Sequence, residues 1–258
     1  MDKATRFFDF AAEVGLTKHI GGLEATDKLA ELCRIGKDTY VLDVGCGVGA
    51  TACRLAGKYG CRVMGIDILP RMVERSRERA KRMNLAGRVE FRTADAQDLP
   101  FEDGLFDAVI TESVTAFPED KQKAVNEYVR VVKPGGYIGL NETAWLKVPV
   151  PPEILEWVSQ DPVATPRPLE PSAWTQLLEK AGVKEIVSRT STINIREETR
   201  GIFQRYGCLG MIGIYFRMFL LYFRNPAYRE FLKHVRQEGL TPKNVTEYFG
   251  YGLFVGRK

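Results

Sequence analysis

Three aspartates in the first half of the chain stand at or just after the ends of short apolar runs. Asp43 lies near the end of the first run, Asp67 ends the second and Asp95 follows the third. An acid at Asp43 suits a cationic group such as an amino-acid ammonium, and a carboxylate at Asp67 can accept hydrogen bonds from both ribose hydroxyls. A carboxylate at Asp95 suits the exocyclic amine of adenine. Together they predict a ligand that joins an adenine nucleoside to an amino acid.

A glycine-rich turn separates the first apolar run from a helical pattern, and it reads Asp43-Val-Gly-Cys-Gly-Val-Gly-Ala50. Glycines allow positive φ angles and let backbone amides approach a ligand closely. The amides and the following helix N-terminus favour an anionic or carboxylate-bearing group. The spacing Gly45-x-Gly47-x-x-Ala50 also fits the dinucleotide fingerprint. A nicotinamide-dependent oxidoreductase therefore stays open as an alternative, although an acid at Asp43 is unusual for that class.

The elements that must position these residues alternate between strand and helix. Short β-branched runs predict strands over 40–45, 62–67, 89–94, 106–111 and 137–141. Helical spacing predicts helices over 25–34, 51–58, 71–84 and 121–132. This alternation predicts a parallel sheet with helices on both faces, which binds ligands beyond the carboxyl ends of its strands.

The second half of the chain is less regular. Seven of the 13 prolines lie in 147–171, so this stretch is expected to be an extended connection with a short helix near 153–159. Beyond it we expect a helix over 172–181, a strand over 183–195, a helix over 199–237 and a final strand over 247–255. The economical interpretation is a single domain over 1–258, with cap helices over about 1–35 and a helical lid insertion over about 197–243.

Composition narrows the class of protein. The 258 residues are 45% apolar and 27% charged, which excludes disordered and low-complexity classes. A net charge of +4 is too mild to predict nucleic-acid binding. Five cysteines without a C-x-x-C pair argue against a disulfide framework and against a metal site, and they favour a reducing, cytoplasmic compartment. The first residues do not resemble a signal peptide.

Five motifs in order resemble those of class I S-adenosylmethionine-dependent methyltransferases of the small-molecule, methyltransferase-domain-11 type. They are the glycine turn, Gly65-Ile-Asp67, Asp95-Ala-Gln-Asp-Leu-Pro-Phe101, Phe106-Asp-Ala-Val-Ile110 and Lys133-Pro-Gly-Gly136. The resemblance implies a doubly wound α/β fold with a seven-stranded, mostly parallel sheet and a helical insertion before the last strand. It also implies the cofactor S-adenosyl-L-methionine, with S-adenosyl-L-homocysteine as the product.

The resemblance assigns roles to individual positions. Asp43, Gly45, Cys46 and Gly47 would surround the methionine part of the cofactor. The other implied cofactor-binding residues are Gly22, Asp67, Ile68, Asp95, Ala96 and Glu112.

Candidate catalytic residues are fewer. The segment His19-Ile-Gly-Gly22 resembles the entry loop of small-molecule N-methyltransferases. His19 could take a proton from the acceptor near neutral pH, and Glu112 could balance a cationic amine. The methyl acceptor is expected to be a small molecule, either an amine or an apolar, quinone- or lipid-like compound. A non-catalytic cofactor-binding protein of the same fold is a further alternative.

The longest apolar run, residues 207–223, is shorter than a membrane-spanning helix requires and contains Arg217. It is interpreted as a buried helix, as a lid over the acceptor, as a membrane-surface contact or as a dimer face. The lid interpretation nominates an acceptor pocket made by Tyr206, Tyr215, Arg217 and Phe219. The sequence leaves membrane contact and the choice between monomer and homodimer open.

Overall fold

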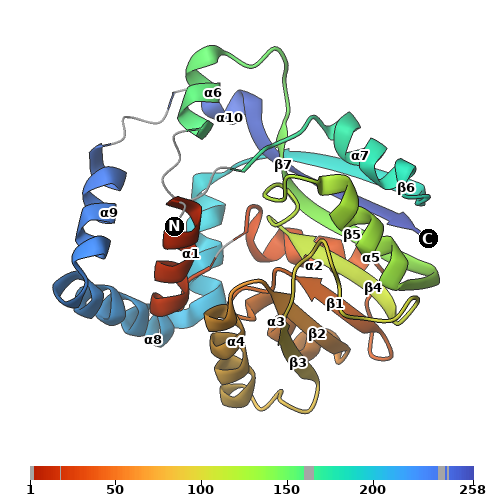
Figure 1. The fold of residues 1–258 in the computed structure, drawn as a ribbon, viewed down its shortest axis with the longest axis horizontal. Helices are drawn as coiled ribbons and strands as arrows, with labels where there is room; N and C mark the ends of the chain where they lie inside the picture. The colour runs from red at the N-terminus through yellow and green to blue at the C-terminus, as the bar shows by residue number, and fades with distance from the viewer. Residues whose placement is uncertain (1–2, 18, 160–165, 238–241, 243) are drawn as a thin grey trace.

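A seven-stranded sheet forms the centre of the protein, in the order β3-β2-β1-β4-β5-β7-β6 (Figure 1). The computed structural model describes residues 3–17, 19–159, 166–237, 242 and 244–258. The strands are β1 (Tyr40–Val44), β2 (Arg62–Asp67), β3 (Val89–Thr93), β4 (Phe106–Glu112), β5 (Val132–Trp145), β6 (Lys184–Thr192) and β7 (Phe249–Arg257). The first five run parallel, and β7 runs antiparallel between β5 and β6. The predicted doubly wound, mostly parallel sheet is therefore confirmed.

Helices cover both faces of this sheet. The first face packs against α2 (Gly22–Leu32), α3 (Ala50–Tyr59) and α4 (Pro70–Arg82), and the second against α5 (Lys121–Val131) and α7 (Pro171–Lys180). Alternate residues of β1 follow this division, since Val41 enters the first core and Leu42 the second. A strand buried on both faces needs a nearly continuous apolar sequence, which explains why these runs are recognisable.

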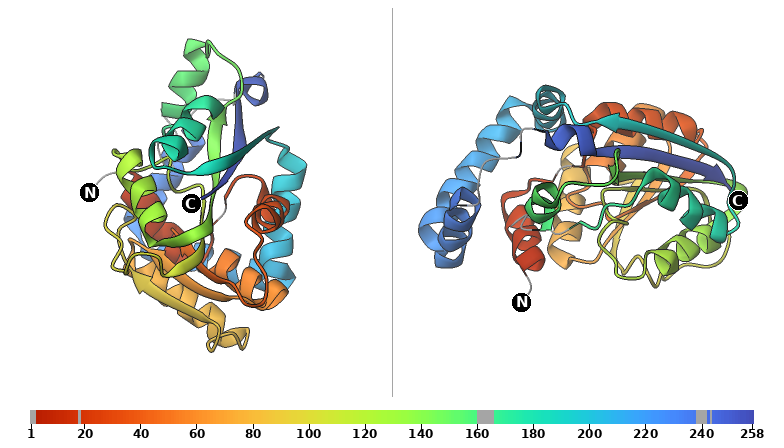
Figure 2. Two further views of the ribbon diagram at one scale, coloured as in Figure 1. Left: turned by 90° about the vertical axis from the view of Figure 1, so that its right-hand side faces the viewer. Right: turned by 90° about the horizontal axis from the view of Figure 1, so that it is seen from above.

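The remaining helices lie outside the two layers that cover the sheet. They are α1 (Lys3–Val14), α6 (Pro152–Ser159), α8 (Ile195–Arg224), α9 (Pro226–Gln237) and the short α10 (Val245–Tyr248). Helix α1 packs against α8 and α9 through a small apolar cluster that includes Phe10, Val14, Leu221 and Tyr228. Figure 2 shows α8 and α9 projecting away from the sheet beside α1.

The structure corrects two sequence-based boundaries. The helix expected over 199–237 is two helices, because Asn225 interrupts it: its Oδ1 accepts from the Ala227 and Tyr228 amides, and Pro226 opens the next helix. Helix α8 also kinks at Gly207, where φ is 67° and ψ is 170°. The strand expected over 137–141 is longer, since β5 begins at Val132 and continues to Trp145. Residues 238–241 and 243 of the expected insertion lie outside the described residues.

Candidate active site

A cavity of about 350 Å³ opens at the carboxyl ends of β1, β2 and β4. The strand order reverses here, because β2 lies on one side of β1 and β4 on the other. Doubly wound sheets bind their ligands at this place. Side chains from α1, from the first turn of α3 and from α8 complete the wall, and they include Phe8, Thr51 and Arg205.

The glycine turn lets the backbone curve around the cavity. Gly45 has a φ of 69°, and a Cβ there would lie 2.3 Å from the Val114 side chain. Gly49 has a φ of 73°, and its Cβ would lie 2.7 Å from Ser76. A side chain at either position would therefore clash as well as strain the backbone. These two glycines therefore let the turn pack closely against the loop after β4 and against α4.

Asp67, the last residue of β2, is hydrogen-bonded to the backbone of the glycine turn. Its Oδ2 accepts from the Gly47 amide at 2.9 Å, and its Oδ1 accepts from the Leu69 amide at 3.0 Å. Burial raises the pKa of Asp67, while these amides act in the opposite direction. Each carboxylate oxygen has a second lone pair, and the side chain lines the cavity. The carboxylate is thus fixed in orientation and able to accept from a ligand.

Asp43 is the least compensated polar group in the cavity wall. The residue is 2% exposed, and its Oδ2 is buried without a hydrogen-bond partner. Burial and the nearby Glu112 carboxylate raise the pKa of Asp43 well above its usual value. An unsatisfied buried carboxylate is costly unless a cation or donor meets it. The cavity therefore suits a positively charged ligand group beside Asp43.

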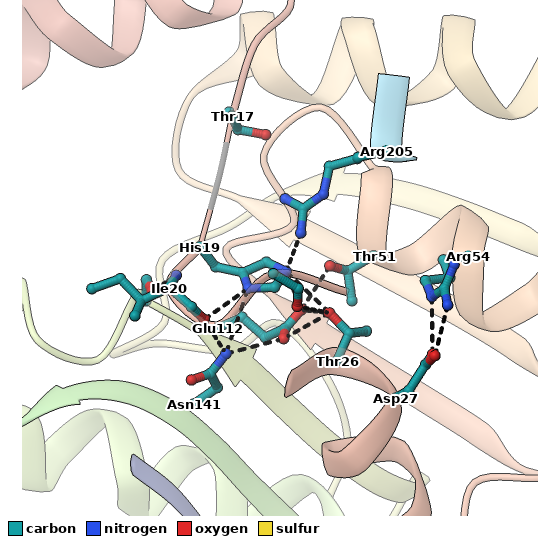
Figure 3. A network of polar contacts seen from close by, with 12 residues as sticks. Thr17, His19, Ile20, Thr26, Asp27, Thr51, Arg54, Glu112, Asn141 and Arg205 are labelled. Atoms are coloured by element: carbon teal, nitrogen blue, oxygen red, sulfur yellow. Dashed lines mark hydrogen bonds and ion pairs between the residues drawn. The ribbon is translucent and has the colours of Figure 1, made fainter. Parts of the chain in front are cut away.

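Glu112, at the end of β4, is the centre of a polar network that forms part of the cavity wall (Figure 3). It accepts from Thr51 Oγ1 at 2.7 Å and from Thr26 Oγ1 at 3.1 Å. His19 Nε2 lies 3.2 Å from Glu112 Oε2 and also accepts from Arg205. The network joins α2, α3, β4 and α8 to the segment before α2. Its bonds fix the positions of both residues expected to be catalytic.

The ring of His19 is held in its neutral form. Burial lowers the pKa of His19 to about 4, although the Glu112 carboxylate favours the charged form. With Nε2 accepting from Arg205, the proton is assigned to Nδ1, which lies 3.2 Å from the Ile20 carbonyl oxygen. A neutral imidazole with so low a pKa is a weak base at neutral pH. The expectation that His19 titrates near neutrality therefore differs from the structure.

We expect His19 to make the protein sensitive to acid. Its pKa is lower in the folded chain than in the unfolded one, so stability is fully present above about pH 6.5 and is lost as pH falls toward about 4. The loss attributable to His19 is about 1.4 kcal/mol per pH unit in that interval. Urea unfolding at neutral and acidic pH should show a smaller loss for His19→Gln than for the unchanged chain. Equal losses in the two proteins would contradict the assignment.

A second buried carboxylate organises the loop that follows β4. Glu142 is fully buried and accepts from the amides of Val114, Thr115 and Ala116 and from the Thr111 hydroxyl. The loop carries Ser113, Val114, Phe117 and Pro118 into the cavity wall. Glu142 therefore fixes the loop after β4 as part of the cavity wall.

The structure brings most of the predicted site residues together. The cavity wall contains His19, Asp43, Gly45, Cys46, Gly47, Asp67, Ile68, Asp95, Ala96 and Glu112. Gly22 is not among the lining residues and begins α2 beside Gly201. Among the described residues, no group of three His, Cys, Asp or Glu side chains could hold a metal ion.

The proposed acceptor residues on α8 lie elsewhere. Tyr215 and Phe219 are 59% and 60% exposed and do not line the cavity. Arg217 donates to the Val14 carbonyl of α1 at 2.6 Å. Tyr206 bonds through its hydroxyl to the Thr17 backbone. The structure thus does not place these four side chains in the cavity.

Sequence reasoning missed several cavity residues. Arg205 directly precedes Tyr206, but nothing local distinguishes it from the other arginines of the helix. Phe8 of α1 and Phe117 of the loop after β4 both line the cavity and pack edge to face, with ring centroids 5.7 Å apart. Thr51 follows the last residue of the glycine turn, and its hydroxyl could have been proposed as a partner for a carboxylate.

Comparisons with known proteins agree with this geometry. The model of a family described as a methyltransferase domain matches residues 42–140. An uncharacterised protein of Haemophilus influenzae is 33% identical over 181 residues, which are 69% of this chain and 72% of that protein. Tocopherol O-methyltransferase of Arabidopsis thaliana is 44% identical over 98 residues, which are 38% of this chain and 28% of that enzyme.

The fold is shared with solved structures. The cyclase SpnF superposes with a TM-score of 0.75 and 21% identity, covering 99% of this chain and 94% of that one. The α/β sheet, the helical insertion and the cavity at the strand ends define a Rossmann-like methyltransferase fold. The chain belongs to the class I S-adenosylmethionine-dependent methyltransferases. The cofactor of the family is S-adenosyl-L-methionine.

The residues present fit that cofactor. It carries an ammonium and a sulfonium, and the unpartnered buried oxygen of Asp43 is an acceptor for a cation in this cavity. It also carries a ribose, and Asp67 is held at the cavity with lone pairs available. Gly45 and Gly47 line the cavity with backbone alone, so no side chain of the turn obstructs the ligand there. Buried acids, rather than the net positive charge of the chain, therefore define the site.

Proposed function

We propose that the protein transfers a methyl group from S-adenosylmethionine to a small molecule with an apolar body. The observation that carries the proposal is the aromatic pair of Phe8 and Phe117. It lines the same cavity as Asp43, Asp67 and Asp95, which together form an acidic cradle. The bound cofactor supplies an electrophilic methyl group on sulfur. Positioning an acceptor against such a group can provide much of the rate, so a strong base is not required.

The acidic residues bind and orient the cofactor in this proposal. Asp43 opposes the ammonium of the methionine part, and Asp67 accepts from the ribose hydroxyls. Asp95 and Ala96 bind the edge of the adenine, and Ile68 lies against its face. Ile68 is 63% exposed, which agrees with a side chain that a ligand would cover. Gly45, Cys46 and Gly47 supply the turn around the methionine part.

Apolar side chains receive the acceptor. Phe8, Val114, Phe117 and Pro118 line the cavity from α1 and from the loop after β4. Such side chains exclude water and favour an aromatic or aliphatic acceptor over a small charged amine. Arg205 brings α8 into the cavity wall, so we propose that the helical insertion contributes to a cover over the site. Glu112 and His19 position Arg205 and the segment before α2.

Three alternatives differ in what they predict. An amine acceptor would use Glu112 as a counter-charge, but this carboxylate already accepts from Thr26, Thr51 and Asn141. In a nicotinamide-dependent enzyme the buried carboxylate of Asp43 would have no ligand ammonium to pair with. The fold alone does not exclude a protein that binds the cofactor without transferring a methyl group, since a structure of the same fold is named a cyclase and not a methyltransferase. Turnover separates this last alternative from a methyltransferase.

We expect the enzyme to transfer labelled methyl groups to apolar phenols or quinols, and not to ethanolamine or glycine. The test incubates the chain with methyl-labelled S-adenosylmethionine and each acceptor set. Phe8→Ala and Phe117→Ala should raise KM for the acceptor about tenfold, because each removes a large apolar contact. Their affinity for S-adenosylhomocysteine should stay within about threefold of the unchanged chain. Labelling of the amines alone would contradict the proposal.

A cytoplasmic location, a monomer or homodimer and the absence of nucleic acid among the partners stay predictions from the sequence. The single-domain organisation and the lid role of the insertion also stay predictions.

A further inference from the structure

An apolar stripe runs along the second half of α8, after the kink at Gly207. It consists of Leu209, Ile212, Tyr215, Phe216, Phe219, Tyr222 and Phe223, which are between 45% and 86% exposed. Their spacing of three or four residues places them on one face of the helix. At a rise of 1.5 Å per residue the stripe is about 21 Å long. The sequence interpretation as a buried helix therefore holds only for the opposite face.

That opposite face fixes α8 to the body of the protein. Met211, Ile214 and Leu221 are buried, and Leu221 packs with Phe10 and Val14 of α1. The Arg217 side chain donates to the Val14 carbonyl oxygen. By length and composition, Arg200–Arg224 is the one described helix that could cross a membrane, and 17% of its most apolar window is buried. A helix held along one face by α1 is better suited to lie in a membrane surface than to cross it.

The stripe is large for a surface that only meets water. Its five aromatic side chains, each of about 150–250 Å² and about half exposed or more, present on the order of 600 Å², to which Leu209 and Ile212 add. Monomeric proteins rarely leave apolar patches of more than a few hundred Å² exposed, and larger ones mark interaction sites. The area is also close to the 800 Å² or so per partner that a stable protein interface needs. Area alone therefore does not identify the occupant.

The charges around the stripe indicate what kind of surface it contacts. Residues 200–224 contain four arginines and no acid. Arg224 is exposed at the end of the stripe, and the half-buried Arg229 beside it donates to the Tyr222 and Phe223 carbonyls. The exposed Arg82 of α4 lies close enough to act electrostatically on Arg217.

The neighbouring acids are already paired, since Glu78 lies with Arg75 and Glu230 with Lys233. An excess of arginine beside exposed aromatic rings matches a surface of anionic lipid. A second copy of the chain would use the same patch on both sides, so the arginines of both copies would enter one interface without acids to pair them.

We propose that the apolar stripe of α8 docks this protein onto the surface of a membrane that contains anionic lipids. The stripe enters the boundary between headgroups and acyl chains, and the arginines beside it contact lipid phosphates. Helix α1 connects this surface to the active site, because Phe10 packs toward α8 and α9 while Phe8 lines the cavity. Docking would therefore bring the cavity near a membrane. The proposal stands independently of the identity of the methyl acceptor.

The test uses Cys208 as a reporter. Cys208 is exposed beside the stripe, and the four other cysteines are buried, so an environment-sensitive fluorophore reacts there selectively. We expect its emission to shift to the blue with vesicles of phosphatidylcholine and phosphatidylglycerol. Phosphatidylcholine alone should give little shift, and added salt should reverse most of the effect. Co-sedimentation of the unlabelled chain should show the same lipid dependence.

Variants distinguish binding through the stripe from non-specific hydrophobic adsorption. Phe216→Ser combined with Phe219→Ser should weaken vesicle binding at least tenfold, and Arg224→Glu should weaken it severalfold. Leu155→Ser, a matched change at another exposed apolar side chain, should bind as the unchanged chain does. All variants should keep the unfolding temperature of the unchanged chain, which shows that they fold.

Three results would overturn the proposal. The first is equal binding to neutral and anionic vesicles, and the second is binding that survives the double serine change. The third is a dimer in light scattering that the double serine change dissociates, which would assign the stripe to a second copy.

Discussion

Replacing Asp67 by alanine is expected to weaken S-adenosylhomocysteine binding by about a hundredfold or more. The carboxylate is held by the Gly47 and Leu69 amides and faces the cavity. Two hydrogen bonds from ribose hydroxyls to a charged group contribute about 1.5–3 kcal/mol each, and their loss gives this reduction. The change also removes the acceptor of the Gly47 amide, so the glycine turn loses part of its support. Isothermal titration calorimetry measures the affinity directly.

Two further variants make this result specific. Asp67→Asn keeps the size of the side chain and one carbonyl acceptor, so its affinity should fall between those of the unchanged chain and the alanine variant. Asp38→Ala changes an exposed aspartate before β1 that does not line the cavity, and it should bind normally. If Asp67→Ala binds within threefold of the unchanged chain while remaining folded, Asp67 does not hold the ribose.

Replacing Asp43 by asparagine is expected to stabilise the ligand-free protein and to abolish its stabilisation by the cofactor. The unpartnered Oδ2 of Asp43 and the repulsion from Glu112 both penalise the buried charge. Removing that charge should add about 1–3 kcal/mol to the free energy of unfolding at neutral pH. The same change removes the counter-charge of the ligand ammonium. Differential scanning fluorimetry with and without S-adenosylhomocysteine measures both effects.

The gain in stability should depend on pH. Burial raises the pKa of Asp43 in the folded chain above its unfolded value of 3.8, so the folded chain binds the proton more tightly. The free energy of unfolding therefore falls as pH rises from the unfolded pKa of Asp43 toward its higher folded pKa. Asp43→Asn has no such fall, and its advantage over the unchanged chain should grow from about pH 4 toward neutrality. Asp38→Asn, a matched exposed change, should show no advantage. A cofactor-induced shift that persists in Asp43→Asn would contradict the assigned role.

Much of the cofactor site is predictable because it is built from local units. Asp43, Gly45 and Gly47 lie within one strand and its following turn, so their spacing in the sequence fixes their spacing in the fold. Asp67 ends the next strand of the same sheet, and parallel pairing places Asp43 opposite Gly65, two residues before it. The alternation of strands and helices then determines that Asp43, Asp67 and Asp95 lie at the same edge of the sheet.

The acceptor side was not predictable in the same way. The contact between Arg205 and His19 joins residues separated by 186 positions, and it depends on how α8 packs against the sheet. Phe8 reaches the cavity because α1 lies between α8 and the strand ends, and no periodicity in α1 reveals that position. Tyr215 and Phe219 were nominated from composition alone. An apolar helix face is equally compatible with a pocket, a core and an exposed surface until its packing is known.

The pKa of His19 also required the structure. A histidine in a sequence carries its ordinary value near 6.5, which suggests a base at neutral pH. The fold buries the ring beneath Arg205 and beside Thr26, and burial lowers the pKa to about 4. The side chain most often chosen as a catalytic base is here part of a network that positions other groups.

Calorimetric titration of the unchanged protein with S-adenosylhomocysteine, and separately with NAD, tests the cofactor site most directly. We predict one binding site per chain for S-adenosylhomocysteine with micromolar or tighter affinity, about −8 kcal/mol or lower, and no measurable heat with NAD. The same titration on Asp43→Asn should show binding strongly weakened. Binding of NAD without binding of S-adenosylhomocysteine would contradict both the assignment of the acidic cradle and the methyl transfer proposed from it.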